Sequence, residues 1–374
     1  MPVIAGVINT YILSRLILAA FKWKGPVYSR EVANGMAAIW GSRIAQLGRL
    51  SVKVTGLEQL NGLDGKFIFA FNHKSYLDFA LGPFAFSGRG FDFKFMAARD
   101  HFLDNPLIYR TMGLALEAIG TIFVDRKRRE ASPKEAAATA VEKLVSSDVD
   151  VVLFPQGTRA LGNIDSNGRR LDSGYYTSGT RERLLKSGGH IKKGAAHIAA
   201  DVSIALKDRE RSVVHIVPVG LVGTGQAAPK KSIFIRKETD IFVKVGAPIS
   251  IKCSDIKNIE KGSAEYKNFV ENIHLQLDKR LKELLEIHNR LEQRFFRDIR
   301  GLLPASDFEH VSVAMKAWRG KDYLIYTILD CIYAADPKRW QELQRELSYL
   351  LTSDAPLGSL LHFKERAVET LGIK

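Results

Sequence analysis

The chain contains almost no cysteine. Its two cysteines, Cys253 and Cys331, stand far apart in 374 residues and have neither the spacing of a metal site nor that of a redox motif. The nine histidines are scattered along the chain, so no cluster of His and Cys indicates zinc. We therefore expect no metal centre, and reduced thiols in a protein that faces the cytosol.

Other cofactor signatures are incomplete. The run from Gly223 to Gly225 lacks the rest of a dinucleotide fingerprint. Asp165, Asn167 and Gly168 resemble part of a calcium loop, but no carboxylate-rich series follows at the required spacing. These gaps exclude a nucleotide cofactor and a calcium site from our expectations.

Acidic residues are in deficit. Against 55 Lys and Arg there are 41 Asp and Glu, which gives a net charge of +14. Such a charge admits nucleic acid, an anionic membrane surface or an anionic substrate as partner. No zinc finger, basic zipper or RNA-recognition signature is present, so the sequence disfavours a nucleic-acid-binding protein.

The basic residues at the N-terminus flank apolar runs. Residues 1–53 hold seven Lys and Arg against the single acid Glu31, and the run from Val3 to Phe21 is almost wholly apolar. This pattern predicts a helix in the lipid interface, hence a monotopic anchor on the cytoplasmic face. A single span, which needs about 20 apolar residues, is an alternative, as is a helix packed on the protein core.

A His and an Asp follow a predicted buried strand. The apolar run from Lys66 to Ala70 leads into Asn72 and His73, and Asp78 lies five residues beyond His73. A neutral imidazole can take a proton from a substrate hydroxyl, and a carboxylate fixes its tautomer. The plainer reading is an N-cap at this point. The pair can meet if His73 lies in a loop and Asp78 in the first helical turn.

Three later runs also end in polar or turn-forming groups. They are residues 120–126, 151–159 and 215–220, and the first two end in Arg126 and Arg159. Such ends line the crevice beyond the strand termini of an open α/β sheet. A His/Asp pair with two arginines suits an anionic ester whose free hydroxyl is to be acylated, because arginine presents a planar fork of donors to phosphate.

These four blocks, in this order, resemble those of the glycerolipid acyltransferase family, over roughly residues 50–250. The resemblance implies an enzyme that moves an acyl group from acyl-CoA or acyl-carrier protein to the free hydroxyl of a lysophospholipid. The leading acceptor is 1-acylglycerol-3-phosphate, which would yield phosphatidic acid. It implies no cofactor beyond the acyl thioester, and the partners are the thioester, the lysophospholipid and an anionic membrane surface.

The resemblance also implies roles for single residues. His73 is the expected general base and Asp78 its orienting partner. Polar and basic groups would bind the acceptor: Arg126, Gln156, Gly157, Thr158 and Arg159. Arg99 and Lys193 are weaker candidates for the same role.

The chain departs from the family at two places. Gln156 stands where the family carries Glu, which removes a charge and adds two N–H donors. Residues 160–190 form an insertion, which we interpret as a flexible loop or as a lid over the substrate. Both departures keep open another acceptor, such as glycerol-3-phosphate, another lysophospholipid or an amino lipid. A non-catalytic lipid-binding scaffold on the same fold is a further alternative.

The predicted architecture is α/β, with a mixed central sheet flanked by helices. Strands are expected near residues 66–71, 93–98, 121–125, 149–154, 213–221 and 241–247, with an Ala-rich helix over residues 134–145. The predicted regions are a membrane-facing helical segment (1–50), an acyltransferase domain (51–255, including the insertion) and an accessory helical region (256–374).

Overall fold

The computed structural model describes residues 2–125, 127, 131–159, 163–164, 170–171, 191–228, 235, 237–256, 258–285 and 362. The chain divides into two compact units, residues 1–159 with 192–284, and residues 160–191 with 285–374. Of the second unit the description covers a short antiparallel pair, β6 (Asn163–Ile164) with β7 (Arg170–Leu171). The predicted helices beyond residue 285, Cys331, Arg126 and most of the insertion lie outside the described residues.

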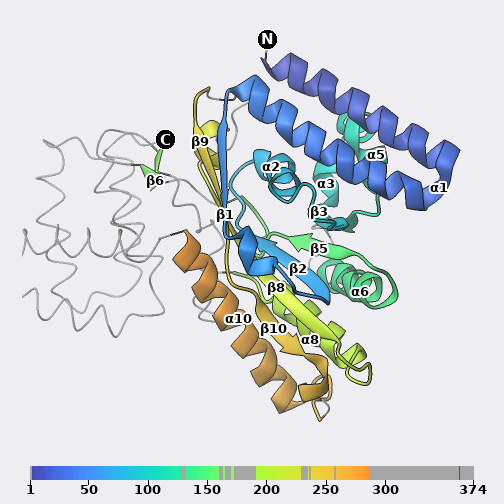
Figure 1. Cartoon of the computed structure of the whole chain (residues 1–374), viewed down its shortest axis with the longest axis vertical. Helices are drawn as coiled ribbons and strands as arrows, with labels where there is room; N and C mark the ends of the chain where they lie inside the picture. The colour runs from blue at the N-terminus through green and yellow to red at the C-terminus, as the bar shows by residue number, and fades with distance from the viewer. Residues whose placement is uncertain are drawn as a thin grey trace, which may run out of the picture. The chain divides into compact units, whose positions relative to one another are not determined.

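The first unit is built on a mixed sheet that is flanked by helices, as predicted (Figure 1). Within the described residues the sheet has eight strands, in the order β1-β9-β8-β2-β5-β3-β4, with β10 also paired to β8. The strands are β1 (Ser51–Thr55), β2 (Lys66–Phe71), β3 (Phe93–Ala98), β4 (Ile122–Val124), β5 (Asp150–Leu153), β8 (Val213–Val222), β9 (Asp240–Val245) and β10 (Ile249–Lys252). All six predicted strands are therefore present, and β1 and β10 are additional.

The central strands run in one direction. β2 pairs in parallel with both β8 and β5, and β3 pairs in parallel with both β5 and β4. β9 and β10 pair antiparallel with β8. The carboxyl ends of β8, β2, β5, β3 and β4 consequently meet along one edge of the sheet, which is where α/β proteins place their sites.

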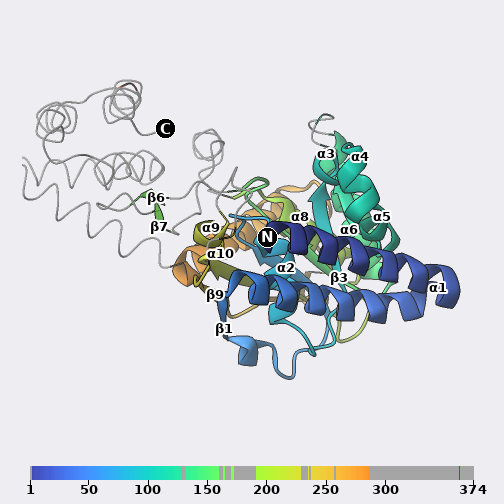
Figure 2. The same cartoon turned by 90° about the horizontal axis from the view of Figure 1, so that it is seen from above.

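Helices cover both faces of this sheet (Figure 2). The helix α1 packs on α2, and on the opposite face α8 packs against α6 and α10. The longer helices are α1 (Pro2–Gly48), α2 (Leu77–Ala85), α6 (Ala131–Ser146), α8 (Gly194–Ala205) and α10 (Ala264–Leu284). The shorter helical segments are η1 (Leu57–Leu60), α3 (Arg99–Phe102), α4 (Pro106–Ile108), η2 (Tyr109–Gly113), α5 (Leu114–Ala118), α9 (Thr224–Ala227) and η4 (Cys253–Ile256).

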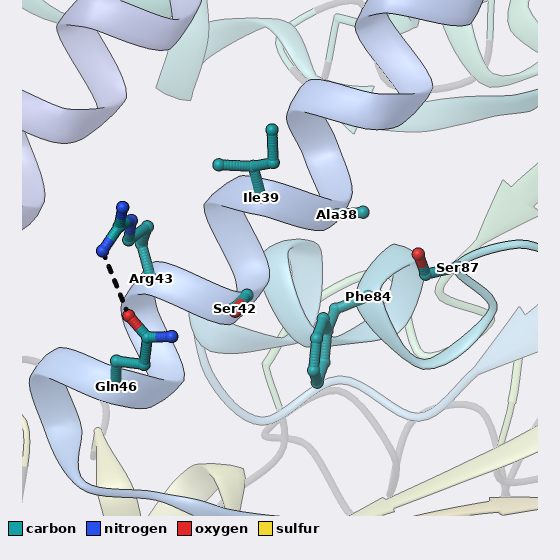
Figure 3. Close-up of a pocket in the computed structure, with 7 residues that line it drawn as sticks. All are labelled: Ala38, Ile39, Ser42, Arg43, Gln46, Phe84 and Ser87. Carbon is teal, nitrogen blue, oxygen red and sulfur yellow. Dashed lines mark hydrogen bonds between the residues drawn. The ribbon is translucent and has the colours of Figure 1, made fainter.

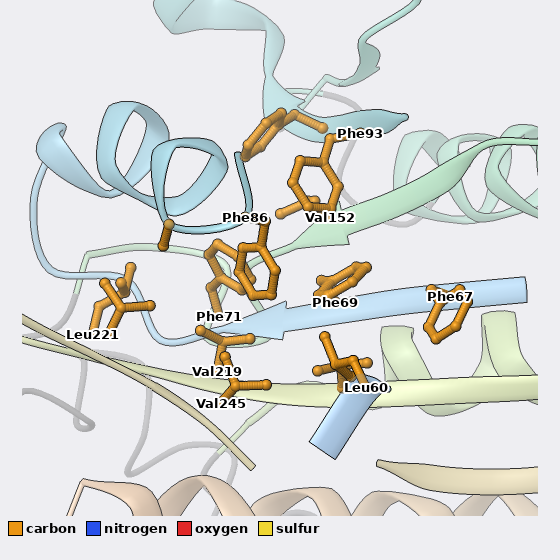
Figure 4. Packing of buried hydrophobic residues seen from close by; sticks show 14 residues of the cluster. Leu60, Phe67, Phe69, Phe71, Phe86, Phe93, Val152, Val219, Leu221 and Val245 are labelled. Carbon is orange, nitrogen blue, oxygen red and sulfur yellow. The ribbon is translucent and has the colours of Figure 1, made fainter. Parts of the chain in front are cut away.

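A cluster of phenylalanines anchors β2, the strand that leads to the predicted site (Figure 4). Phe67, Phe69 and Phe71 alternate along β2, so all three face the same side of the sheet. There the Phe69 ring meets the rings of Phe86 and Phe93 edge-to-face, with centroids 5.1 Å and 5.0 Å away. Burial of aromatic rings in this geometry favours one register of the strand, because a slip of one residue would place these large rings on the opposite, equally buried face, in the space of Ile68 and Ala70.

The α1 segment folds back on itself. The Trp40 indole Nε1 donates to Thr10 Oγ1 over 2.9 Å, although the two residues are 30 positions apart. In a straight helix they would lie about 45 Å apart. Two antiparallel arms are visible in Figure 1, and Gly25-Pro26, which disfavours a straight helix, is midway between the bonded residues. Among the described residues, no helix combines the length and apolarity needed to cross a membrane.

The second arm of α1 crosses α2 at a glycine. A Cβ on Gly41 would lie 2.4 Å from the carbonyl oxygen of Ala80 and 2.5 Å from Cβ of Phe84. These contacts are too short for any side chain, so the two helix backbones approach as closely as they do because this position has none. The same crossing buries Ile44, Leu77 and Leu81 in one apolar cluster.

Gly41→Ala should therefore destabilise the protein by about 1–3 kcal/mol, because the added methyl group must push α1 away from α2. Gly35→Ala on the same helix is the matched control. Its Cβ would meet nothing within 4 Å, and alanine should stabilise the helix by about 0.5–1 kcal/mol. Chemical denaturation of both variants measures the difference. Equal effects at the two positions would contradict the close crossing.

Candidate active site

His73 and Asp78 form a buried pair at the carboxyl end of β2. His73 lies in the loop after β2, and Asp78 lies in the first turn of α2. The Nδ1 atom of His73 is 2.7 Å from Oδ2 of Asp78, and the two side chains are 12% and 0% exposed. With Nδ1 held by the carboxylate, Nε2 is the ring nitrogen left to face a substrate, and it has no hydrogen-bond partner among the described residues.

Asp78 binds more than the imidazole. Its Oδ2 also accepts the backbone N–H of Lys74 at 2.7 Å and that of Ser75 at 2.9 Å. A buried carboxylate needs such donors, because their hydrogen bonds replace the water it has lost. Ser75 Oγ in turn accepts the N–H of Leu77 at 3.2 Å. The N-cap position of α2 is Tyr76, which makes no side-chain cap bond, so the carboxylate and imidazole of the His/Asp pair are the main side-chain contacts of this turn.

Two aromatic rings fix the plane of the imidazole. Phe154 stacks on His73 with ring centroids 4.2 Å apart, and Phe79 meets it edge-on at 5.6 Å. Phe154 follows β5, and Phe79 lies on α2. The imidazole is thus restrained by rings on two sides and by a carboxylate at one nitrogen, which leaves little rotational freedom.

Asn72 joins the end of β2 to the end of β8. Its side-chain Nδ2 donates to the carbonyl oxygen of Leu221 at 2.9 Å, and its Oδ1 accepts the N–H of the same residue. The amide thereby continues the parallel pairing of the two strands beyond Phe71. It is fully buried, so both of its polar atoms need these partners.

The loop after β5 brings the third sequence block against the first. Gln156 is fully buried, and its Oε1 accepts the backbone N–H of His73 at 2.8 Å. The guanidinium of Arg159 lies over the ring of Tyr76, 4.1 Å from its centroid. A guanidinium that stacks on a ring keeps its N–H donors in its own plane, directed away from the aromatic face and able to bind an anion.

Between these residues the chain turns at Gly157 and Thr158. Gly157 has φ of 71°, in the left-handed region that favours glycine. A Cβ at this position would lie 2.6 Å from Nζ of Lys192, so the lysine side chain passes directly over the turn. Lys192 is held there because its own N–H donates to the carbonyl of Pro155 at 2.7 Å.

The remaining basic candidates are engaged elsewhere. Arg99 Nε is 3.6 Å from Oδ1 of Asp104, at the start of α3. Lys193 Nζ is 2.5 Å from Oε2 of Glu271 on α10. These ion pairs draw both side chains towards carboxylates, whereas Lys192 lies over the Gly157 turn. Arg126 lies outside the described residues.

Lys74 places a buried amine beside the pair. It is almost fully buried, and burial lowers the pKa of its ammonium well below the ordinary value, while the charge of Asp78 opposes that shift.

Among the described residues no group of His, Cys, Asp and Glu is arranged to hold a metal ion.

Sequence reasoning missed Phe154, Tyr76 and Lys192. Each stands inside or next to a block that was recognised, but an aromatic residue beside a motif is ordinarily part of the core. The choice between adjacent Lys192 and Lys193 depends on the direction in which each side chain leaves the start of α8. That direction follows from the bond between the Lys192 N–H and Pro155 and was not readable from the sequence.

An open groove lies at the other end of α2 from Asp78, against the second arm of α1 (Figure 3). It has a volume of about 450 Å³ and is lined by Ala38, Ile39, Ser42, Arg43, Gln46, Phe84 and Ser87. Arg43 and Gln46 are hydrogen-bonded to each other at 3.3 Å on its rim. None of the predicted site residues lines it.

Comparison with known proteins agrees with the residues of this site. Residues 51–222 match the model of a family described as Acyltransferase. These residues contain the His73–Asp78 pair, the Arg159 turn and the whole of β8. Over these residues the chain is similar to the acyltransferase family, and the curated relatives that it resembles are 1-acyl-sn-glycerol-3-phosphate acyltransferases.

Two curated relatives are chloroplast 1-acyl-sn-glycerol-3-phosphate acyltransferases. LPAT1 of Arabidopsis thaliana is 26% identical over 68% of this chain and 59% of its own length. BAT2 of Brassica napus is 25% identical over 62% of this chain and 56% of its own length. The chain thus spans somewhat more than half of each relative. The crystal structure of the LPA acyltransferase PlsC from Thermotoga maritima covers 75% of this chain and 98% of its own, at 20% identity and a TM-score of 0.43.

Proposed function

We propose that the protein transfers a fatty acyl group from an acyl thioester to the free hydroxyl of a lysophospholipid, with 1-acylglycerol-3-phosphate as the acceptor and phosphatidic acid as the product. The observation that carries the proposal is the 2.7 Å contact between His73 and the fully buried Asp78, which occupies Nδ1 and leaves Nε2 as the ring nitrogen without a described partner, at the edge where the parallel strands end. The match of residues 51–222 to the acyltransferase family model and the names of the two curated relatives support it.

In this reaction His73 acts as general base. Its Nε2 takes the proton of the acceptor hydroxyl while the oxygen attacks the thioester carbonyl carbon. The resulting tetrahedral intermediate collapses, the carbon–sulfur bond breaks, and the thiol leaves with the proton held by the imidazolium. Asp78 keeps the proton of His73 on Nδ1 and stabilises the imidazolium while it exists. The chain needs no nucleophile of its own, because the acceptor supplies the attacking oxygen.

The acceptor phosphate binds at the turn after β5. Arg159, presented by its stack on Tyr76, provides donors in one plane, and Gly157 and Thr158 provide the turn itself. Lys192 lies over the same turn and adds a second positive charge. Arg126 is also proposed to bind the acceptor phosphate, and Arg99 and Lys193 are weaker candidates for that role. The thioester is acyl-CoA or acyl-carrier protein, and no further cofactor takes part.

Acyl transfer from a labelled long-chain thioester, given as acyl-CoA and as acyl-carrier protein, tests this function. We expect product with 1-acylglycerol-3-phosphate and a fall in kcat of about 10²–10⁴-fold in His73→Ala, the range that a general base contributes. His197→Ala is the control, because His197 contacts Tyr266 away from the site. Undiminished turnover by His73→Ala would contradict the mechanism.

A panel of other acceptors belongs in the same assay. Transfer only to glycerol-3-phosphate, to another lysophospholipid or to an amino lipid would keep the chemistry and replace the acceptor. No transfer to any acceptor by a folded protein that still binds lipid would favour the non-catalytic scaffold.

Arg159→Met should raise the KM for 1-acylglycerol-3-phosphate about 10-fold or more and leave kcat nearly unchanged, because the guanidinium binds the phosphate in both the ground state and the transition state. Tyr76→Leu should act in the same direction, since it removes the ring on which Arg159 rests. Tyr76→Phe keeps that ring and is the matched control. A variant of Arg159 with an unaltered KM would remove this residue from the phosphate site.

The first arm of α1 docks on an anionic membrane surface at the cytoplasmic face. The apolar side chains of Ile8, Ile12 and Leu16 are 53%, 51% and 47% exposed, and Trp23 is 80% exposed. Their spacing places them on one face of the helix, and Arg15 and Lys22 lie beside them. An apolar helical face flanked by cations is suited to an interface of acyl chains and acidic headgroups.

Leu16→Glu should weaken the sedimentation of the protein with vesicles that contain anionic phospholipid, because it places a carboxylate in the docking face. Gln46→Glu is the control, since it adds the same charge to an exposed site on the other arm. Wild-type protein should bind anionic vesicles more tightly than neutral ones. Equal sedimentation of both variants would argue against docking through this face.

A further inference from the structure

Gln156 contacts the backbone of the expected general base. β2 ends at Phe71, so the N–H of His73 lies beyond the pairing of the strands and must find an acceptor elsewhere. The acceptor is Oε1 of Gln156, at 2.8 Å, which reaches across from the loop after the neighbouring strand β5. Gln156 has no solvent exposure, so water cannot replace this bond if the side chain is changed.

The same loop also contacts the imidazole ring of His73. Phe154, two residues before Gln156, stacks on the ring at 4.2 Å. Asp78 fixes the ring nitrogen, but it belongs to the same segment as His73 and moves with it. The loop after β5 therefore fixes the position of the segment that carries His73 and Asp78 relative to the end of β5. The same loop carries Arg159. Gln156 is the element of this link that binds the main chain.

We propose that Gln156 is a positioning residue for His73, and that it acts through a side-chain oxygen that needs no negative charge. The proposal rests on the function proposed above and deepens it. It also accounts for Gln at a place where the family carries Glu, because the amide keeps the oxygen acceptor. Asp78 already places a carboxylate 2.7 Å from Nδ1 of His73, and the amide of Gln156 adds no further charge to this turn.

Two substitutions separate the acceptor oxygen from the shape and the charge of the side chain. Gln156→Met has similar length but no acceptor oxygen, and it should lower kcat about 10–100-fold with little change in the acceptor KM, because a small misplacement of a base slows the chemical step. Gln156→Glu keeps an oxygen and should retain kcat within about threefold of the wild type. Gln59→Met, at an exposed site in η1, is the control for the chemical change and should behave as the wild type.

A spectroscopic measurement tests the contact without turnover. The chain has nine histidines, so selective ¹⁵N-histidine labelling gives few amide signals, and loss of one signal in His73→Gln assigns it. In Gln156→Met the His73 amide should shift and exchange faster with solvent, and in Gln156→Glu it should stay protected. Thermal unfolding of each variant shows that it is folded.

The outcomes distinguish this inference from the proposed function. Wild-type protein that transfers no acyl group would defeat the function, while the amide signal would still decide whether Gln156 holds His73. An unaltered kcat and an unaltered His73 amide in Gln156→Met would overturn the positioning role. So would a rise in the acceptor KM with kcat preserved, since that result would make Gln156 a substrate contact.

Discussion

The buried carboxylate of Asp78 is the interaction on which the rest of the site depends. One of its oxygens receives the imidazole Nδ1 of His73 and the main-chain N–H groups of Lys74 and Ser75. The same atom thus holds the turn between β2 and α2 and the imidazole of His73 together. A buried carboxylate is tolerable only when it receives such hydrogen bonds, so the residue proposed to orient His73 also stabilises the local fold.

Strand direction explains why distant blocks of sequence meet. Because β8, β2, β5, β3 and β4 run in parallel, residues that follow each of them are delivered to one edge. Side chains then join neighbouring strand ends, as Asn72 does with Leu221 and Gln156 does with His73. The site therefore forms only at the edge of the assembled sheet, where side chains from several sequence blocks come together.

Much of this arrangement could be predicted from local pattern. The apolar runs predicted β2 and β3, and helix geometry set the condition under which His73 and Asp78 meet, with Asp78 in the first turn of the helix, where the structure places it. Side-chain direction and long-range pairing were not predictable in this way. The Thr10–Trp40 bond that folds α1 back depends on packing between two arms that look alike in sequence, and the polar alternation of β1 gives no sign of its partner β9. The stack of Arg159 on Tyr76 likewise depends on how two loops approach.

The hydrogen bonds between Asn72 and Leu221 join residues 149 positions apart. A chain that grows from its N-terminus presents α1 and β2 long before β8 exists, so the loop that carries His73 has no partner for Asn72 until residue 221 has been made. Contacts of such long separation form late, because the closure of the intervening chain must come first. During synthesis the exposed apolar face of α1 is thus complete before the loop that carries His73 has all its partners.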